Sequence, residues 1–226
     1  MPAAETFHPF LVTPNASVAR IAPFFVFVLL TALQGYFGGE GRFWIYLAKT
    51  LLAVAMLWQW RWAFPEVRLT LDGVVFLAGA LIALLWVGLD GLYPKISSAS
   101  VEWNPIGAFP EHPLKAWLFI GVRLVGATLI VPVLEELFYR SFFYRRWQAD
   151  DFLTISLGTF HKAAFLVTAI VFGFAHHEWL PGILCGLILQ WLVVRRGHLG
   201  DAIIAHGVAN LLLGGWVVWK GAWHFW

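Results

Sequence analysis

Two adjacent carboxylates and an arginine interrupt a long apolar stretch in the middle of the chain. Residues 131–140 read Val-Pro-Val-Leu-Glu-Glu-Leu-Phe-Tyr-Arg, and most residues back to position 116 are apolar. Ionisable side chains in such a segment cost at least a few kcal/mol each in lipid and usually face a bundle interior or a watery cavity. Glu135, Glu136 and Arg140 are therefore candidate functional residues. The alternative is a buried polar clamp that fixes helix packing.

Helical spacing separates the roles of these three charges. Glu136 and Arg140 are four positions apart, so they share a helix face and can pair. Glu135 points about 100° away from Glu136, which leaves it for a partner on another helix. Pro132 removes a backbone hydrogen bond and can kink or open the helix beside the carboxylates.

Two further motifs place polar groups in apolar segments. Phe172 and His176 are four positions apart, and so are His206 and Asn210. A desolvated carboxylate such as Glu135 can act as a general base toward water, and a nearby histidine can share that water and move its proton. The second pair can donate hydrogen bonds to the oxyanion of a tetrahedral intermediate. These side chains together predict hydrolysis of an amide bond by activated water.

Such hydrolysis needs a route for water into the membrane. Pro132, Gly173 and Gly207 are the residues that we expect to leave room for one. His177, beside His176, is a rival for the histidine role. A three-ligand zinc site of Glu135, His176 and His206 is an alternative, although the chain contains no HExxH motif.

The composition predicts an all-α, polytopic membrane protein. The chain has 226 residues, of which 60% are hydrophobic and 12% charged, and a mean hydropathy of +0.75. After an N-terminal lead-in (1–20), we expect one membrane-embedded helical domain (21–226) with its motif-bearing core at 114–219. Seven spans are predicted, within a range of six to eight. They lie at about 21–39, 43–61, 71–91, 114–140, 163–178, 180–195 and 201–219.

The net charge and the distribution of Lys and Arg over the loops predict the orientation in the membrane and argue against a nucleic-acid partner. The net charge of +2 comes without a basic cluster interleaved with aromatic residues, so no nucleic-acid partner is expected. Alternate loops carry eight and four Lys or Arg residues, and the positive-inside rule then places the N-terminus in the cytoplasm. The richer side has Arg20, Arg61, Arg68, Arg145, Arg146, Lys162, Arg195 and Arg196. Lys49, Arg123 and Arg140 lie within predicted spans. We expect a multi-pass protein of a bacterial inner membrane.

Three motifs of this chain, in the same order and on separate predicted helices, resemble those of the CPBP (ABI) family of glutamic-type intramembrane proteases, which includes the type II CAAX prenyl endopeptidases. They are Glu135-Glu136-x-x-x-Arg140, Phe172-x-x-x-His176 and His206-x-x-x-Asn210. The resemblance implies that Glu135 activates water with His176, that His206 and Asn210 stabilise the oxyanion, and that Glu136 and Arg140 support them, with Phe172 beside the histidine. It implies no cofactor and no metal.

The resemblance also implies the substrate class, a membrane-anchored protein or peptide cleaved near its C-terminus. Members of this family have been proposed to act in bacteriocin self-immunity, so a non-catalytic membrane scaffold or immunity protein is an alternative. The protease hypothesis requires Glu135 to lie within about 8 Å of His176 or His206. At about 1.5 Å of rise per residue from the nearest cytoplasmic charge, His176 lies about 6 Å deeper than Glu135, unless its helix tilts or starts inside the membrane.

Overall fold

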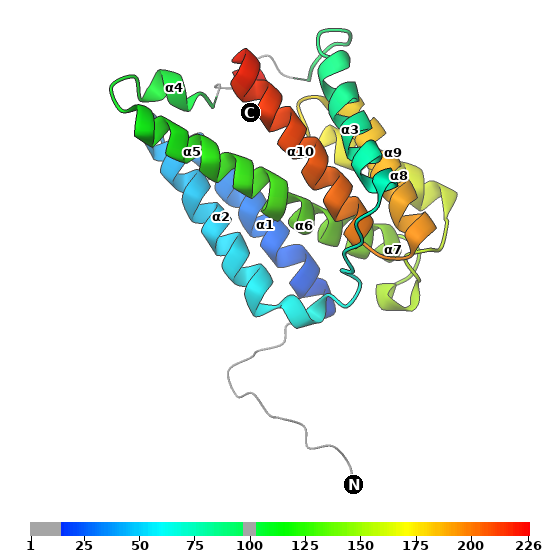
Figure 1. The fold of residues 1–226 in the computed structure, drawn as a ribbon. Coiled ribbons are helices and arrows are strands. Elements are labelled where there is room, and N and C mark those ends of the chain that lie inside the picture. Colours follow the sequence, from blue (N-terminus) through cyan, green and yellow to red (C-terminus); the bar gives the residue numbers. More distant parts are fainter. Residues whose placement is uncertain (1–14, 97–102) are drawn as a thin grey trace.

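A computed structural model describes residues 15–96 and 103–226, and within these ranges helices are the only regular elements (Figure 1). Residues 1–14, most of the predicted lead-in, lie outside the described part. The α-helices are α1 (Ala16–Gln34), α2 (Gly41–Gln59), α3 (Gly73–Gly88), α4 (Pro105–Ala108), α5 (Pro113–Val125), α6 (Val131–Glu136), α7 (Tyr144–Arg146), α8 (Lys162–Phe174), α9 (Trp179–Arg196) and α10 (Gly200–Lys220). Short 3-10 turns occur at Arg61–Ala63, Phe152–Thr154 and Trp223–Phe225.

The predicted fold class, a polytopic helical membrane bundle, is confirmed. Each of the seven predicted spans overlaps a long helical segment. Four of these segments are long and apolar enough to cross a membrane, namely α1, the continuous helix Pro113–Arg146, α9 and α10. The apolar helices α3 and α8 have only 16 and 13 residues. Judged by length and composition, the described helices therefore include fewer than the seven predicted spans.

The helix that carries the two adjacent carboxylates is continuous from Pro113 to Arg146 and contains two π-helical segments. Its register is π-helical at η2 (Gly126–Ile130) and at η3 (Leu137–Phe143), on either side of α6. In η2 the N–H of Val131 donates to the carbonyl of Gly126. The next donor in that register would come from Pro132, which has no N–H. The carbonyl of Ala127 is therefore left without a helical partner.

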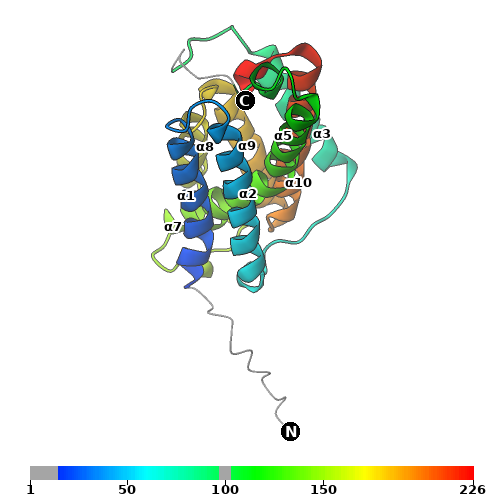
Figure 2. The ribbon, with the colours of Figure 1, turned by 90° about the vertical axis from the view of Figure 1, so that its left-hand side faces the viewer.

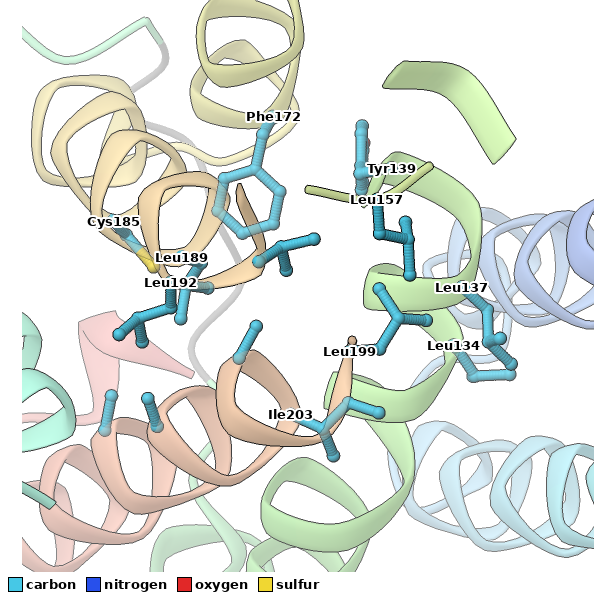
Figure 3. Close-up of a cluster of buried hydrophobic side chains, with 14 of the residues drawn as sticks. Leu134, Leu137, Tyr139, Leu157, Phe172, Cys185, Leu189, Leu192, Leu199 and Ile203 are labelled. Carbon is cyan, nitrogen blue, oxygen red and sulfur yellow. The ribbon is translucent and has the colours of Figure 1, made fainter. Parts of the chain in front are cut away.

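The long helix lies between two groups of helices (Figure 1). On one side α1 and α2 form a hairpin, and they run side by side in the view turned by 90° (Figure 2). On the other side α3 packs on α10, and α8 packs on α9. A hydrophobic core of side chains from α6, η3, α8, α9 and α10 fills the centre of the bundle, including Leu134, Leu137, Phe172 and Leu189 (Figure 3). This core fixes the relative positions of the three motif-bearing segments.

Glycines allow these helices to touch closely. A Cβ atom at Gly173 would lie 2.3 Å from Cγ1 of Ile183 on α9, and one at Gly207 would lie 2.7 Å from the carbonyl oxygen of Thr128. The expectation that Gly173 and Gly207 leave room for water is therefore wrong. Neighbouring helices occupy the space beside them, as small residues in membrane bundles permit.

Candidate active site

Glu136 is the centre of a buried polar network. Its side chain is 0% exposed, as is that of Arg140. Nη1 of Arg140 donates to Oε1 of Glu136 at 3.2 Å, and Nε of Arg140 lies 3.2 Å from Oε2. The pair predicted from the four-residue spacing is thus present. A third member comes from α10, because Nδ1 of His206 lies 3.0 Å from Oε1 of Glu136.

His206 connects Glu136 to Glu135. A carboxylate accepts hydrogen bonds, so we place the Nδ1 proton of His206 on the bond to Glu136. The other ring nitrogen, Nε2, then faces Glu135, whose Oε2 is 3.8 Å away. Within residues 15–96 and 103–226, Oε2 of Glu135 is buried and has no hydrogen-bond partner. Glu135 is therefore the carboxylate that is not paired with Arg140, as helical spacing predicted, and its 3.8 Å approach to His206 meets the distance criterion.

His176 follows the C-terminal end of α8, where its ring is held in place. Nδ1 of His176 donates to the carbonyl of Phe172 at 2.8 Å, which leaves Nε2 with a free lone pair. The ring packs edge-on against Trp86 of α3, at 5.5 Å between centroids, and lies 4.8 Å from the ring of Phe172. Trp86 escaped the sequence analysis because nothing distinguishes it from the other tryptophans of an apolar span.

His176 and Glu135 line the same cavity. In the described part of the chain no hydrogen bond or ion pair joins them. His177 also lines this cavity, is exposed, and has no hydrogen bond or ion pair among the described residues. The structure therefore holds the ring of His176 in a defined orientation and leaves that of His177 without a polar anchor.

Asn210 and Phe172 complete the predicted set. Nδ2 of Asn210 donates to the carbonyl of Ala127 at 2.8 Å, the same carbonyl that Pro132 leaves without a helical donor. The guanidinium of Arg140 stacks over the ring of Phe172 at 4.2 Å. Phe172 in turn lies 6.0 Å from the ring of His206. Six of the seven residues chosen from the sequence are thus linked by these contacts where the long helix, α8 and α10 meet, and the seventh, Asn210, lines the same cavity.

The cavity next to this cluster has a volume of about 900 Å³. Its lining runs from Glu135, His176 and His206 to the α1–α2 loop and to Phe225 and Trp226 at the C-terminus. A volume of this size is typical of sites that enclose a small ligand or a short peptide segment. The unpaired carboxylate is thus accessible to a ligand from within the cavity.

The zinc alternative finds no preformed ligand set. Among the described residues, no group of three or more His, Cys, Asp and Glu side chains is arranged to hold a metal ion. Glu135 and His206 approach each other, but Nδ1 of His206 is directed to Glu136. A zinc ion would need His176 to turn away from the Phe172 carbonyl or to bind through Nε2.

Comparison with known proteins finds similarity over the central region. The family model "Type II CAAX prenyl endopeptidase Rce1-like" matches residues 116–212. UPF0177 protein YxdF of Lactococcus lactis subsp. lactis (strain IL1403) is 29% identical over 90 residues, which are 38% of this chain and 45% of that protein. UPF0177 protein YaiF of the same strain is 28% identical over 107 residues, 46% of this chain and 44% of that protein.

The matched stretch spans less than half the length of either relative. No solved structure matches the chain. The family match covers all three motifs and the helices that bring them together. Residues 116–212 of this helical membrane protein are therefore similar to the Rce1-like family, in agreement with the resemblance of its motifs.

Proposed function

We propose that the protein is an intramembrane endopeptidase that hydrolyses a peptide bond of a membrane-associated protein or peptide with water activated by Glu135. One observation carries this proposal. Of two neighbouring carboxylates, Glu136 is fully buried and paired with Arg140 and His206, whereas Glu135 is 15% exposed, lines the cavity and has no Lys or Arg partner among the described residues. An unpaired carboxylate is costly in such a place, so we ascribe its retention to chemistry.

In the proposed reaction, a water molecule lies between Glu135 and the scissile carbonyl. Glu135 takes a proton from the water as the oxygen attacks the carbonyl carbon, and the proton later passes to the leaving amine. His176 helps to hold the water through Nε2, because its Nδ1 is committed to the Phe172 carbonyl. The protein supplies the base and the proton path, so no covalent intermediate with the enzyme is formed.

The negative charge that develops on the carbonyl oxygen requires hydrogen-bond donors. We propose His206 and Asn210 for this role. Asn210 uses one amide hydrogen for the Ala127 carbonyl and keeps the other for the oxyanion. In the proposed reaction His206 donates to the oxyanion from Nε2, with the proton on Nδ1 directed to Glu136. Glu136 and Arg140 would therefore position His206.

The proposed location is the inner membrane of a bacterium, with the N-terminus in the cytoplasm. The Lys- and Arg-rich loops lie at the end of the bundle where α1 begins, and α4 and the C-terminus lie at the other end (Figure 1). The cavity lining reaches the α1–α2 loop and the C-terminal residues. In this orientation the cavity extends from the catalytic cluster toward the outer side of the membrane.

The test is proteolysis by the purified, detergent-solubilised protein against lipidated and unlipidated peptides, with and without a zinc chelator. Glu135→Gln and His206→Ala are compared with Glu111→Gln, a change at an exposed carboxylate outside the cavity. The proposal expects cleavage that survives chelation, disappears in the first two variants and persists in the third. Cleavage lost to the chelator would assign the residues to a zinc site. No cleavage by the folded protein would favour a scaffold or immunity role.

A further inference from the structure

Two cationic side chains in the wall of the same cavity have no carboxylate partner. Lys49 of α2 is 3% exposed, and Arg123 of α5 is partly buried. Both line the cavity that contains Glu135. Lys49 lies 4.6 Å and Arg123 5.1 Å from the centre of one ring, that of Tyr46. The two cations are thus neighbours in the wall of the cavity.

The contacts of these cations are neutral. Nζ of Lys49 donates to the hydroxyl of Thr31 at 2.7 Å and lies over the ring of Phe27. The guanidinium of Arg123 lies 4.7 Å from the centre of Trp103 and 5.2 Å from that of Trp226. Within residues 15–96 and 103–226, no Asp or Glu forms an ion pair with Lys49 or Arg123.

Burying two neighbouring cations without an anion carries a high free-energy cost. A buried ammonium is strongly disfavoured unless it is paired, and here the charge that acts on Lys49 is the like charge of Arg123. Cation–π contacts with the aromatic walls offset only part of that cost. Lys49 also keeps two N–H donors, and Arg123 several, for a ligand.

We propose that Lys49 and Arg123 form an anion subsite that binds a carboxylate of the substrate, away from the bond that is cut. This inference rests on the proposed proteolysis at Glu135. The ligand chemistry is a carboxylate, from the C-terminus of the peptide or from an acidic side chain. The enclosed position of Lys49, in the wall of the same cavity as Glu135, favours the substrate over a lipid headgroup at the outer surface.

The spacing of the two subsites sets the reach of the peptide. Arg123 precedes Glu135 by twelve positions on one continuous helix, which is about 18 Å of rise. An extended peptide advances about 3.3 Å per residue. The carboxylate should therefore lie about five residues from the scissile bond. The aromatic rings of Trp103 and Trp226 at Arg123 would cover this end of the peptide.

Binding can be measured without hydrolysis in the Glu135→Gln protein. Three short, fluorescent, apolar peptides serve as probes: one with a free C-terminal carboxylate, its C-terminal amide, and the amide with a final glutamate. Fluorescence anisotropy in detergent should give about ten- to a hundredfold tighter binding for either carboxylate-bearing probe than for the neutral amide. Preference for only the first or only the third probe identifies the source of the carboxylate.

Matched variants assign the preference to the two cations. Lys49→Met and Arg123→Met, made in the Glu135→Gln protein, should each reduce the preference to less than about threefold. Arg123→Lys keeps the charge, so it should retain most of the preference and serves as a control for folding. A purely structural role would instead lower the thermal unfolding temperature and weaken all three peptides equally.

Two outcomes would overturn the anion subsite. Equal affinity for the three peptides in the Glu135→Gln protein would remove its basis. Binding of phosphatidylglycerol in mixed micelles that depends on Lys49 and Arg123, without any preference among the peptides, would assign the site to a lipid. Because the readout is binding, a failure of proteolysis in the unmodified protein would leave a measured carboxylate preference standing. Conversely, cleavage of neutral and charged peptides at equal rates would leave the protease proposal intact.

Discussion

Two partly buried carboxylates, one on the long helix and one packed against it, have opposite environments. Glu66, in the segment between α2 and α3, accepts hydrogen bonds from Arg20 Nε at 2.9 Å and Nη2 at 2.6 Å. It also accepts a hydrogen bond from the hydroxyl of Ser141, and Nη2 of Arg145 lies 3.5 Å away. Arg20 and Arg145 are only 2% and 5% exposed. This cluster joins α1, the α2–α3 segment and the end of the long helix.

Glu135 has no comparable set of donors. Its side chain is 15% exposed, close to the 10% of Glu66. Burial therefore does not distinguish the two carboxylates, but hydrogen bonding does. A carboxylate saturated by donors is held in one position and is a poor base, whereas an unpaired one can accept a proton. The comparison indicates that Glu66 stabilises the fold and that Glu135 is available for chemistry.

The largest expected effect is on activity at Glu135. Glu135→Gln preserves the shape of the side chain but cannot take a proton from water, so cleavage should fall by between about a hundredfold and ten thousandfold. Its thermal unfolding temperature should stay the same or rise, because an unpaired buried carboxylate is removed. Cleavage rates and unfolding of the same detergent sample give both quantities. A variant that cleaves at the original rate would show that Glu135 is not the base.

Glu66→Gln should show the reverse pattern. Removing the anion leaves two buried guanidinium groups without their partner, which should cost about 3 kcal/mol of unfolding free energy. The fraction that remains folded should cleave within about threefold of the original rate, since Glu66 does not line the cavity. Denaturant or thermal unfolding measures the first effect, with Glu111→Gln as the control. An unchanged stability would contradict the structural role of the cluster.

The difference between these clusters also explains what the sequence could predict. Glu135, Glu136 and Arg140 were found because charges stand out in an apolar span, and helical periodicity separated the paired carboxylate from the free one. Arg20 and Arg145 lie near span ends, where charges are common, so they were read as loop charges. Their partner Glu66 is 46 positions from Arg20. No local pattern connects residues so far apart in the chain.

At the candidate site, too, the sequence could not predict the contacts between different helices. The bond between His206 and Glu136 joins residues 70 positions apart, so the sequence could place both in one site but could not show that His206 binds the supporting carboxylate. The free carbonyl of Ala127 had a visible signal in Pro132. Its exact position follows from the π register of η2, a segment that packs closely against α10.

A smaller effect on activity is expected from changes at the Ala127 carbonyl, which accepts a hydrogen bond from Asn210 of α10. Asn210→Ala removes the donor to Ala127 and the proposed oxyanion donor, and should lower kcat by about a hundredfold with little change in KM. Pro132→Ala supplies a backbone N–H that can compete for the same carbonyl, and should lower kcat by less than about tenfold. Steady-state kinetics of both variants provide the test. A larger loss for Pro132→Ala than for Asn210→Ala would mean that helix geometry matters more than the amide.

The smallest effect is expected at a third carboxylate, which is saturated but more exposed. Asp90, beyond the end of α3, pairs with Lys95 at 2.7 Å and with His224 at 2.9 Å. Burial raises the pKa of Asp90, but the hydrogen bonds from Lys95 and His224 outweigh it and hold that pKa below the usual 3.8. Because the pKa is lower in the folded state, the stabilisation is complete well above the unfolded value and is lost as the pH falls through the folded one.

Asp90→Asn should therefore reduce the unfolding free energy by less than about 1 kcal/mol at pH 7, as is usual for ion pairs near the surface. The difference from the unmodified protein should begin to shrink as the pH falls toward the unfolded pKa of 3.8 and vanish once the carboxyl is protonated in the folded protein as well. Thermal unfolding at several pH values measures it, with 1 M salt as a second test because screening weakens exposed pairs. A difference that persists in acid would have to come from packing of the loop. The three carboxylates differ in two properties, their hydrogen-bond donors and their exposure, and of the three only Glu135 combines partial burial with an oxygen that lacks a donor among the described residues.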